Sequence, residues 1–359
     1  MTNTPITIVG AGIAGLTAAY TLQNAGLTPR ILEASSRIGG RVDSLYSAQG
    51  EVIADLGPTW IWPPFQPIIA RWLERLHLPT FDQYDQGDAV LDGFAPTPRR
   101  QPVPGQYGMA RIVGGPQQLI SALVKNLPDG SIQTNTPVDA IHELDNGKLA
   151  VHTDTTTLTT ERVLLATPLR LTAERLNLPD TLKPGVTAAL RAMPTWMAAQ
   201  ARAVMTYDEP FWRHQGLSGR IASRQGPLFE CHDHTSAQGQ ASLFGFVATA
   251  PEHRDPEPLE QAILAQLERC LGPKAAQPIE FRVRDWAKEP WICATADRTG
   301  PPEHPAVGPD LLRSGHLNNR LWFCGAESAD QSPGLIEGAL AAGEQAAEAA
   351  IAEHKRTRL

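Results

Sequence analysis

Residues 6–41 read ITIVGAGIAGLTAAYTLQNAGLTPRILEASSRIGGR, and this stretch is the most informative part of the chain. An apolar, largely β-branched run at 6–9 meets the glycine turn GAGIAG at 10–15, and a helix-favouring stretch follows. A second apolar pair, Ile31-Leu32, ends on the acid Glu33. This order predicts a strand, a tight turn, a helix and a second strand, which is the opening unit of a dinucleotide-binding domain.

Each residue type in the turn has a physical role. Gly10 permits a tight turn, Gly12 leaves room for a diphosphate, and Gly15 lets the helix pack closely on the strand. The helix N-terminus then offers unpaired N–H groups and the positive end of its dipole. Glu33 can accept hydrogen bonds from a ribose diol and would repel a 2′-phosphate, which disfavours NADP. The motif alone does not separate NAD from FAD, and a purely structural turn is the alternative.

Composition limits the class of protein. A chain of 359 residues exceeds the usual size of one core, so we expect two domains. A hydrophobic content of 42% and a charged content of 19% are typical of a soluble globular protein. The net charge of −7 argues against a nucleic-acid-binding surface, and no apolar run reaches the roughly 20 residues of a membrane span.

The N-terminus and the cysteines indicate a cytoplasmic protein. The start, MTNTPITIVG, has neither a basic region nor a cleavage-like site. The four cysteines (Cys231, Cys270, Cys293 and Cys324) are scattered without CxxC spacing. We therefore expect buried, reduced thiols rather than a disulfide framework or a zinc site.

The rest of the chain contains segments that extend the first sheet and segments that predict a second sheet. The apolar run 163–166 predicts a buried parallel strand that returns to the first sheet. Residues 82–108 are rich in Gly, Pro, Asp and Gln and predict an irregular connection. Aromatic, strand-like segments between 170 and 280 predict an antiparallel sheet, and an alanine-rich helix is expected from about Pro333 to His354.

These patterns predict an α/β protein (α+β overall). Its Rossmann-like dinucleotide-binding domain, which the resemblance described next makes an FAD-binding domain, is interrupted by a substrate domain built on an antiparallel sheet and helices. The expected segments are 1–62, 111–170 and 281–359 for the dinucleotide-binding domain, and 63–110 and 171–280 for the substrate domain.

Four motifs carry a resemblance to a known family. They are LEASSRIGGR (32–41), DLGPTWIWP (55–63), LLATPLRL (164–171) and LWFCGAESADQSPGLIEGALAAGEQAAEA (321–349). Together they resemble the flavin-dependent amine oxidase family, which includes monoamine, polyamine and L-amino-acid oxidases. The resemblance implies FAD rather than NAD, with Arg41 near the phosphates and Glu327 on the ribityl chain.

The C-terminal motif also has its own physical logic. Glu327 follows a strand and can hold a polyol hydroxyl. The helix that starts near Pro333-Gly334 would point its positive end at the flavin pyrimidine ring, which favours the reduced, negatively charged flavin. A surface helix with small residues for packing is the alternative.

The residues that we assign to the cofactor extend over the whole chain. They are Gly10, Gly12, Ile13, Ala14, Gly15, Glu33, Ala34, Arg37, Gly40, Arg41, Gly57, Pro58, Thr59, Trp60, Val138, Thr167, Trp286, Trp291, Gly325, Glu327, Gly334, Leu335, Ile336 and Ala339.

The sequence departs from the family pattern at the catalytic lysine. The resemblance places a lysine on a substrate-domain strand, where it reaches the flavin N5 through a water. Counted back from Glu209-Pro210-Phe211-Trp212, that place holds Arg202. Arginine shares the positive charge of lysine but is longer, forked and does not titrate. We predict a catalytic role for Arg202 from its position, and a salt-bridged surface arginine is the alternative.

The tether and the aromatic cage differ too. Monoamine oxidases bind the flavin covalently through a cysteine, and the alignment puts Thr295 at that position, with Cys293 two places earlier. We therefore predict non-covalent FAD, with a slipped alignment onto Cys293 as the alternative. The two cage tyrosines align with Ala296 and Leu335. The resulting candidate substrate pocket is Trp60, Trp196, Trp291, Ala296 and Leu335.

Other chemistry has less support. Residues 230–234 read ECHDH, but adjacent residues of a strand point to opposite faces, so we expect no metal site. We predict an FAD-dependent amine-oxidase-type enzyme that acts on an amine or amino acid and is reoxidised by O2 or another acceptor. A desaturase, a protoporphyrinogen-type oxidase or an isomerase acting on carbon is the alternative, and a flavin-binding module without turnover is a third class.

Overall fold

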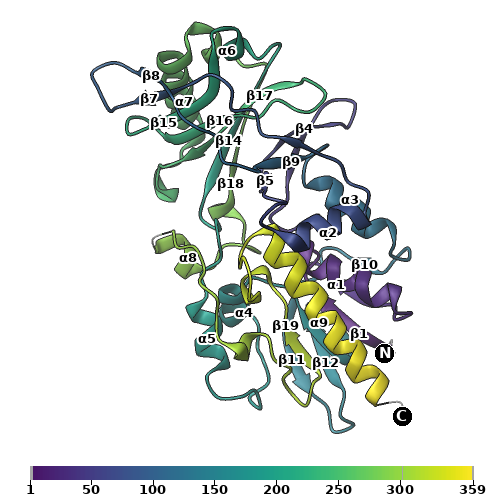
Figure 1. Cartoon of the computed structure of the whole chain (residues 1–359). Coiled ribbons are helices and arrows are strands. Elements are labelled where there is room, and N and C mark those ends of the chain that lie inside the picture. Colours follow the sequence, from purple (N-terminus) through teal and green to yellow (C-terminus); the bar gives the residue numbers. More distant parts are fainter. Residues whose placement is uncertain (1–2, 301, 358–359) are drawn as a thin grey trace.

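A computed structural model describes residues 3–300 and 302–357, which form two bodies built on two sheets (Figure 1). The first sheet carries the N-terminal motif, and both described ends of the chain lie beside it. Its strand order is β10 (Ile132–Gln133), β2 (Arg30–Leu32), β1 (Asn3–Val9), β13 (Thr157–Leu165), β12 (Leu149–Thr153) and β11 (Val138–Glu143), with β19 (Leu321–Phe323) paired to β13.

The first sheet forms because β1 is apolar on both faces. Ile8 pairs in parallel with Ile31 of β2 and Leu164 of β13. Ile8 belongs to the core on one side of the sheet, and Val9 belongs to the core on the other. The predicted strand–turn–helix–strand unit and the returning parallel strand are therefore confirmed.

Helices cover both faces of this sheet. One face holds α1 (Ile13–Asn24), α2 (Pro67–Arg75), α3 (Gln117–Lys125) and α9 (Ile336–Arg356). The other holds α4 (Leu169–Arg175) and α5 (Val186–Ala192). The long helix α9 runs beside α1 (Figure 1), where a Cβ on Gly343 would lie 2.2 Å from the Ala14 carbonyl oxygen. Only glycine allows this close approach of two helix backbones.

The second sheet forms the other body. Its order is β18 (Glu280–Asp285), β14 (Ala201–Tyr207), β17 (Ala241–Val247), β16 (Leu228–Asp233), β15 (Leu217–Ser223), β7 (Asp88–Asp92) and β8 (Arg99–Pro102). All neighbours are antiparallel except β15 and β7. One face of this sheet packs on α7 (Pro256–Leu271). The antiparallel sheet agrees with the prediction from the aromatic, strand-like segments.

Smaller elements complete the fold. β3 (Ser44–Tyr46) pairs with β4 (Val52–Asp55), and β9 (Ala110–Ile112) lies between β5 (Trp60–Ile61) and β6 (Thr80–Asp82). Short helices are α6 (Phe211–His214), α8 (Thr295–Thr299), η1 (Pro251–His253), η2 (Pro273–Ala276), η3 (Trp286–Lys288), η4 (Asp310–Leu312) and η5 (Ala326–Ser328).

The structure corrects the prediction for residues 82–108. This segment contains β7 and β8, which extend the second sheet. Ala89 and Val90 are buried, and Val90 packs in the core beneath this sheet. The strands were missed because each is short and the glycines and prolines around them dominate the local composition.

The expected segment boundaries also differ from the packing. Trp72 of α2 lies in the core shared by α1 and α9, so α2 packs with the first body rather than with the substrate domain. Residues of α4 and α5 pack on the first sheet, so the passage to the second body comes near residue 200 rather than 170. β18 extends the second sheet to Asp285, beyond the expected boundary at 280.

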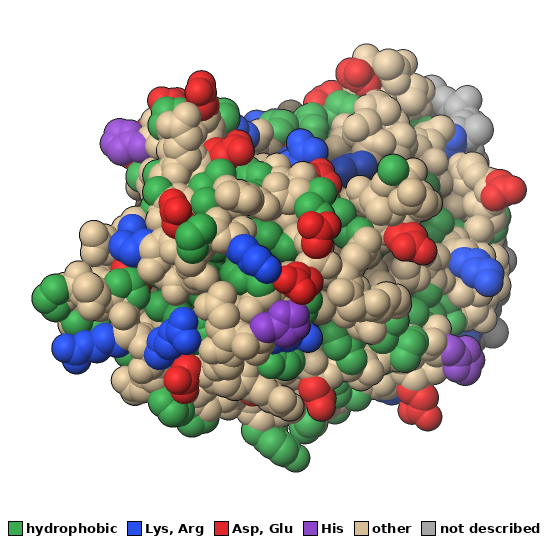
Figure 2. All heavy atoms as spheres, turned by 90° about the horizontal axis from the view of Figure 1, so that it is seen from above, with side chains coloured by type: hydrophobic (Ala, Val, Ile, Leu, Met, Phe, Trp, Pro, Cys, Tyr) green, Lys and Arg blue, Asp and Glu red, His purple; other side chains and the backbone are tan. Residues whose placement is uncertain are grey.

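The surface is mixed in charge. On the face drawn in Figure 2, acidic and basic side chains are interspersed with hydrophobic ones, and no large area of one sign is visible. Among the described residues, no helix is long and apolar enough to cross a bilayer.

Candidate functional site

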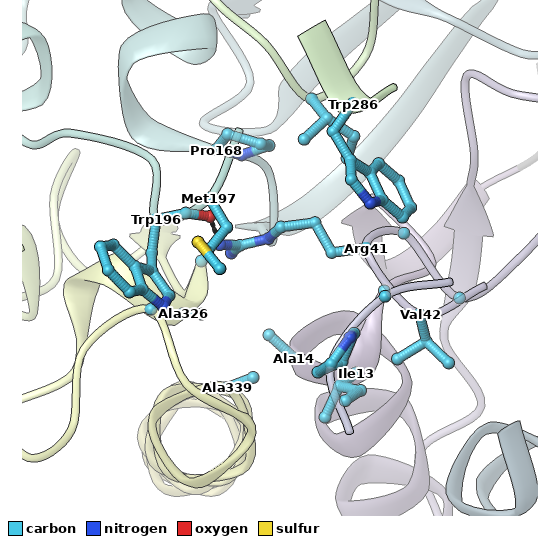
Figure 3. Close-up of a pocket in the computed structure, with 18 of the residues that line it drawn as sticks. Ile13, Ala14, Arg41, Val42, Pro168, Trp196, Met197, Trp286, Ala326 and Ala339 are labelled. Carbon is cyan, nitrogen blue, oxygen red and sulfur yellow. Dashed lines mark hydrogen bonds between the residues drawn. The ribbon is translucent and has the colours of Figure 1, made fainter. Parts of the chain in front are cut away.

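A cavity of about 670 Å³ lies between the two bodies, and most of the predicted site residues line it. In Figure 3 the N-terminal ends of α1 and α9 lie at the floor of the cavity, with Ile13, Ala14 and Ala339. Arg41 and Trp286 reach in from above them, and Trp196 with Met197 closes the opposite side. The second sheet contributes Arg202, Phe229, Glu230 and Phe246 to the wall.

The N-terminus of α1 opens into this cavity. Gly10 has a φ of +101°, which glycine adopts without strain. Gly12 is the N-cap of α1, and no side chain caps the helix. A Cβ on Gly12 would meet nothing closer than the Gly40 Cα at 3.8 Å. The turn therefore leaves an open cradle in front of a helix N-terminus, which is a favourable place for an anion.

Glu33 stands at the end of β2, at the edge of the same cradle. Its Oε2 accepts a hydrogen bond from the Ala11 N–H at 2.7 Å, and its Oε1 accepts one from the Ser35 N–H at 2.9 Å. These bonds hold the carboxylate in one orientation while it lines the cavity. The geometry suits an acceptor for a diol.

Arg41 and Glu327 meet across 286 positions of sequence. Arg41 donates from Nη1 to Glu327 Oε1 at 2.6 Å and from Nη2 to Oε2 at 3.1 Å. The Glu327 side chain is fully buried, and its Oε1 also accepts the Trp196 N–H at 3.2 Å. Arg41 Nη1 in turn donates to the Trp196 carbonyl at 3.0 Å. The two residues therefore fasten the N-terminal motif to the C-terminal motif.

The N-terminus of α9 also faces the cavity. Gly334, Leu335, Ile336 and Ala339 line it, and no side chain caps this 21-residue helix. The uncapped N–H groups and the helix dipole place partial positive charge at this point of the wall.

Arg202 is buried and lines the cavity from β14. Its Nη1 donates to the Gly57 carbonyl and to Thr59 Oγ1, and its guanidinium lies 4.2 Å from the centre of the Phe244 ring. Burial lowers the pKa of Arg202 to about 10, so it stays cationic near neutral pH. None of the ion pairs between described residues includes Arg202, so the alternative of a salt-bridged surface arginine is wrong.

The structure brings nearly all predicted cofactor residues together. Those that line the cavity are Gly10, Gly12, Ile13, Ala14, Glu33, Ala34, Arg37, Gly40, Arg41, Gly57, Pro58, Thr59, Trp60, Val138, Thr167, Trp286, Trp291, Gly325, Glu327, Gly334, Leu335, Ile336 and Ala339. Gly15 does not line it. A Cβ on Gly15 would lie 2.0 Å from the Gly10 carbonyl oxygen, so Gly15 shapes the turn from behind.

The prediction for Ala296 is wrong. Ala296 is exposed on α8 and does not line the cavity, whereas Trp60, Trp196, Trp291 and Leu335 do. An alignment by spacing cannot anticipate that the chain after Ile292 turns outward into a short surface helix.

Sequence reasoning missed several wall residues. Met197, Gln200, Phe229, Glu230 and Phe246 line the cavity without belonging to any of the four family motifs. They come from β16, β17 and the loop before β14, and only the folding of the second sheet over the first body brings them to one place.

Comparisons with known proteins agree with this geometry. The family model for flavin-containing amine oxidoreductases matches residues 13–97 and 94–351. The chain belongs to this flavin-containing amine oxidoreductase family.

Two distant relatives and one solved structure cover nearly the whole chain. A probable flavin-containing monoamine oxidase A of Dictyostelium discoideum is 23% identical over 94% of this chain and 95% of its own length. Putrescine oxidase of Kocuria rosea is 24% identical over 95% of this chain and 94% of its own. Cyclohexylamine oxidase from Brevibacterium oxydans IH-35A has a similar fold, with a TM-score of 0.83 at 19% identity over 99% of this chain and 100% of its own.

The cofactor of this family member is FAD, and the cavity fits it. The open cradle at Gly12 and the N-terminus of α1 would hold the diphosphate, with Glu33 at the adenosine ribose. The N-terminus of α9 would face the flavin ring. A volume of about 670 Å³ is in the range of cofactor pockets.

Asp55 lies behind Arg202 in a buried polar cluster of this flavin-containing oxidoreductase. Its N–H donates to His234 Nε2 at 2.9 Å, and its carboxylate lies 3.4 Å from the same nitrogen. Burial lowers the pKa of His234 well below its usual value, so the ring is neutral. Burial also raises the pKa of Asp55 to about 6, although the Arg111 and Arg202 cations oppose this.

We expect Asp55→Asn to gain stability relative to the wild type as pH rises from 4 to 7. The native state holds the Asp55 proton more tightly than the unfolded state, so ionisation with rising pH destabilises the native protein. The relative gain should be roughly 2 kcal/mol, measured as the free energy of urea unfolding at both pH values.

Asp92→Asn is the control with the opposite sign. Burial raises the pKa of Asp92, but hydrogen bonds from Arg269 and Ser223 outweigh it and lower this pKa. The stability that Asp92 contributes is lost mainly as pH falls below the usual pKa of 3.8, so between pH 4 and 7 this variant should stay close to the wild type, with at most a small relative loss toward pH 7. The same trend in both variants would contradict the assignment of Asp55.

Proposed function

We propose that this protein oxidises an amine at the C–H bond next to nitrogen. Bound FAD would accept a hydride equivalent at N5 and pass the electrons to O2 or another acceptor. The observation that carries the proposal is one cavity with a dinucleotide cradle on one side and an aromatic wall from the second sheet on the other. Putrescine oxidase and cyclohexylamine oxidase, which the chain resembles, act by name on amines.

Some residues of the cavity bind the cofactor, and others contact the substrate. The N-terminus of α1 and Glu33 bind the adenosine-diphosphate half, and the dipole of α9 favours negative charge on the reduced ring system. Trp60 and Phe246 shield the place where the substrate lies from water, and together with the partly exposed Phe229 they supply apolar and aromatic contacts to it.

Anaerobic reduction of the flavin tests this function. We expect primary or secondary amines to bleach the flavin absorbance of the purified holoprotein. A panel of amines, amino acids and hydrophobic alkenes distinguishes the reaction classes. Bleaching by alkenes alone would favour a desaturase or isomerase type of reaction, and no bleaching by any compound would reject turnover.

We expect FAD to be released intact when the protein is precipitated with acid. No cysteine lines the cavity among the described residues: Cys293 is buried beside it, and Thr295 is exposed and bonded to Glu174. A covalent tether would leave the yellow colour in the pellet, so the absorbance of the supernatant decides between the two.

The rate constant for reoxidation of the reduced flavin by O2 should change by about tenfold or more in Arg202→Lys. Lysine cannot make the bonds that Arg202 makes to Gly57 and Thr59 and still keep its charge at the same place. Stopped-flow mixing of reduced protein with O2 measures the rate. Arg111→Lys is the matched control, because Arg111 is equally buried in the same cluster but does not line the cavity. An unchanged rate in Arg202→Lys would remove the proposed catalytic role.

We further propose that the electron acceptor is O2 or another oxidant and that the protein is located in the cytoplasm. The similarity to an L-amino acid dehydrogenase of Synechocystis, at 24% identity, supports an acceptor other than O2 as the alternative. The four cysteines are all free and buried, which suits the reducing cytoplasm that the sequence predicts. Oxygen consumption with an amine substrate, compared with dye reduction, identifies the acceptor.

A further inference from the structure

Three neighbouring strands of the second sheet place Arg202, Phe246 and Glu230 in one row. Arg202 of β14 is the register partner of Phe246 on β17, and Phe246 is the partner of Glu230 on β16. All three line the cavity. Adjacent strands lie about 4.8 Å apart, so the backbones of Arg202 and Glu230 are roughly 10 Å apart, with a cationic side chain at one end of the row and a carboxylate at the other.

An irregularity in β16 sets the carboxylate among aromatic rings. The register with β17 shifts between Leu228 and Glu230, which makes Phe229 the extra residue. Phe229 and Glu230 therefore both line the cavity, whereas consecutive residues of a regular strand would point to opposite faces. The Phe229 ring stacks on Phe246 with its centre 5.8 Å away. An anion flanked by aromatic faces is a favourable environment for an organic cation.

The charge of Glu230 is only weakly compensated by the protein. His232 Nε2 lies 2.8 Å from Oε1, and this contact lowers the pKa of Glu230 and keeps it ionised. Burial lowers the pKa of His232, so the imidazole is neutral near pH 7. One permanent cation forms a long ion pair with Glu230: Arg220 Nη2 lies 3.8 Å from its Oε1, and both side chains are 31% exposed. Another carboxylate that lines the cavity, Glu289, is by contrast paired with Arg284 at 2.8 Å.

We propose that Glu230 is a specificity-determining residue that binds a second positive charge of the substrate. The proposal rests on the amine oxidation proposed above and names its substrate class: primary amines that carry another ammonium group along an alkyl chain. The Arg202 cation repels that ammonium group from its own end of the row. The distant charge of the substrate is therefore held at Glu230, and the uncharged reacting amine lies toward the other end.

Three probes of equal chain length test the proposal: hexan-1-amine, 1,6-diaminohexane and 6-aminohexanoate. They differ only in a neutral, cationic or anionic far end. Anaerobic stopped-flow reduction of the holoprotein gives an apparent Kd and a limiting rate for each. We expect the diamine to bind best and the aminohexanoate worst. Glu230→Gln should weaken diamine binding about 10- to 100-fold through Kd and leave hexan-1-amine within about twofold.

Two further variants exclude a general loss of structure. Glu230→Asp keeps the charge and should keep the diamine preference, whereas Glu230→Arg should shift the preference toward 6-aminohexanoate. Glu209→Gln removes an exposed carboxylate of the same body, which pairs with Lys274, and should leave all three probes unchanged. Far-UV circular dichroism and the bound flavin of each variant confirm folding.

Each outcome decides a separate point. A diamine preference that survives Glu230→Gln, or no preference in the wild type, would overturn the role of Glu230 while amine oxidation stands. Failure of every amine to reduce the flavin would overturn the proposed function itself, and the role of Glu230 with it.

Discussion

Arg41→Ala is expected to lower the free energy of unfolding by about 3–5 kcal/mol, because it leaves a buried carboxylate without its cation. Glu327 is fully buried and receives both of its charged hydrogen bonds from Arg41. The Trp196 N–H that remains cannot neutralise a buried charge. Urea unfolding, followed by far-UV circular dichroism, measures the loss. We also expect weaker FAD binding, since this pair joins the two motifs that enclose the cavity.

Arg71→Ala is the matched control. Arg71 makes the same two-bond pair with Glu344, at 2.8 and 2.6 Å, and it also joins segments far apart in sequence. However, 46% of the Arg71 side chain is exposed, and Arg75 also approaches Glu344. Surface pairs contribute about 1 kcal/mol or less, so this variant should remain close to the wild type. Equal losses in the two variants would contradict burial as the cause.

Gly15→Ala is expected to destabilise the protein by about 3 kcal/mol or more. The added Cβ would lie 2.0 Å from the Gly10 carbonyl oxygen, and backbone cannot move aside as a flexible side chain can. Relieving the clash requires a shift of α1 against β1, at the centre of the first core. The midpoint of urea unfolding measures the effect.

Gly12→Ala should separate cofactor binding from folding. Gly12 has a φ of −77°, which alanine adopts without strain, and its Cβ would make only ordinary van der Waals contacts, the shortest at 3.8 Å from the Gly40 Cα. We therefore expect the stability of the apoprotein to stay within about 1 kcal/mol of the wild type. FAD affinity should fall by at least about tenfold, because the methyl group occupies the diphosphate cradle. Fluorescence titration of apoprotein with FAD measures this. A tightly bound cofactor in Gly12→Ala would contradict the assigned cradle.

Local patterns were sufficient wherever neighbours in sequence are also neighbours in the structure. The turn at Gly10 and Gly12 and the acid Glu33 lie within one strand–turn–helix–strand unit, so spacing alone positions them. The C-terminal element was equally readable, since Glu327 follows β19 and α9 begins nine residues later. By the same reasoning, errors arose where the local signal was weak, as in β7 and β8, or where spacing was carried into an irregular segment, as at Ala296.

The strand–turn–helix–strand unit, the FAD cradle and the family could be predicted from the sequence, because these depend on short-range geometry that particular residue types require. How that cradle is closed follows from the packing of the two bodies. The pairing of Arg41 with Glu327, the burial of Arg202, and the row of Arg202, Phe246 and Glu230 all depend on strands and loops that are distant in the chain. No local periodicity encodes such contacts, since they exist only once the second sheet has packed against the first body.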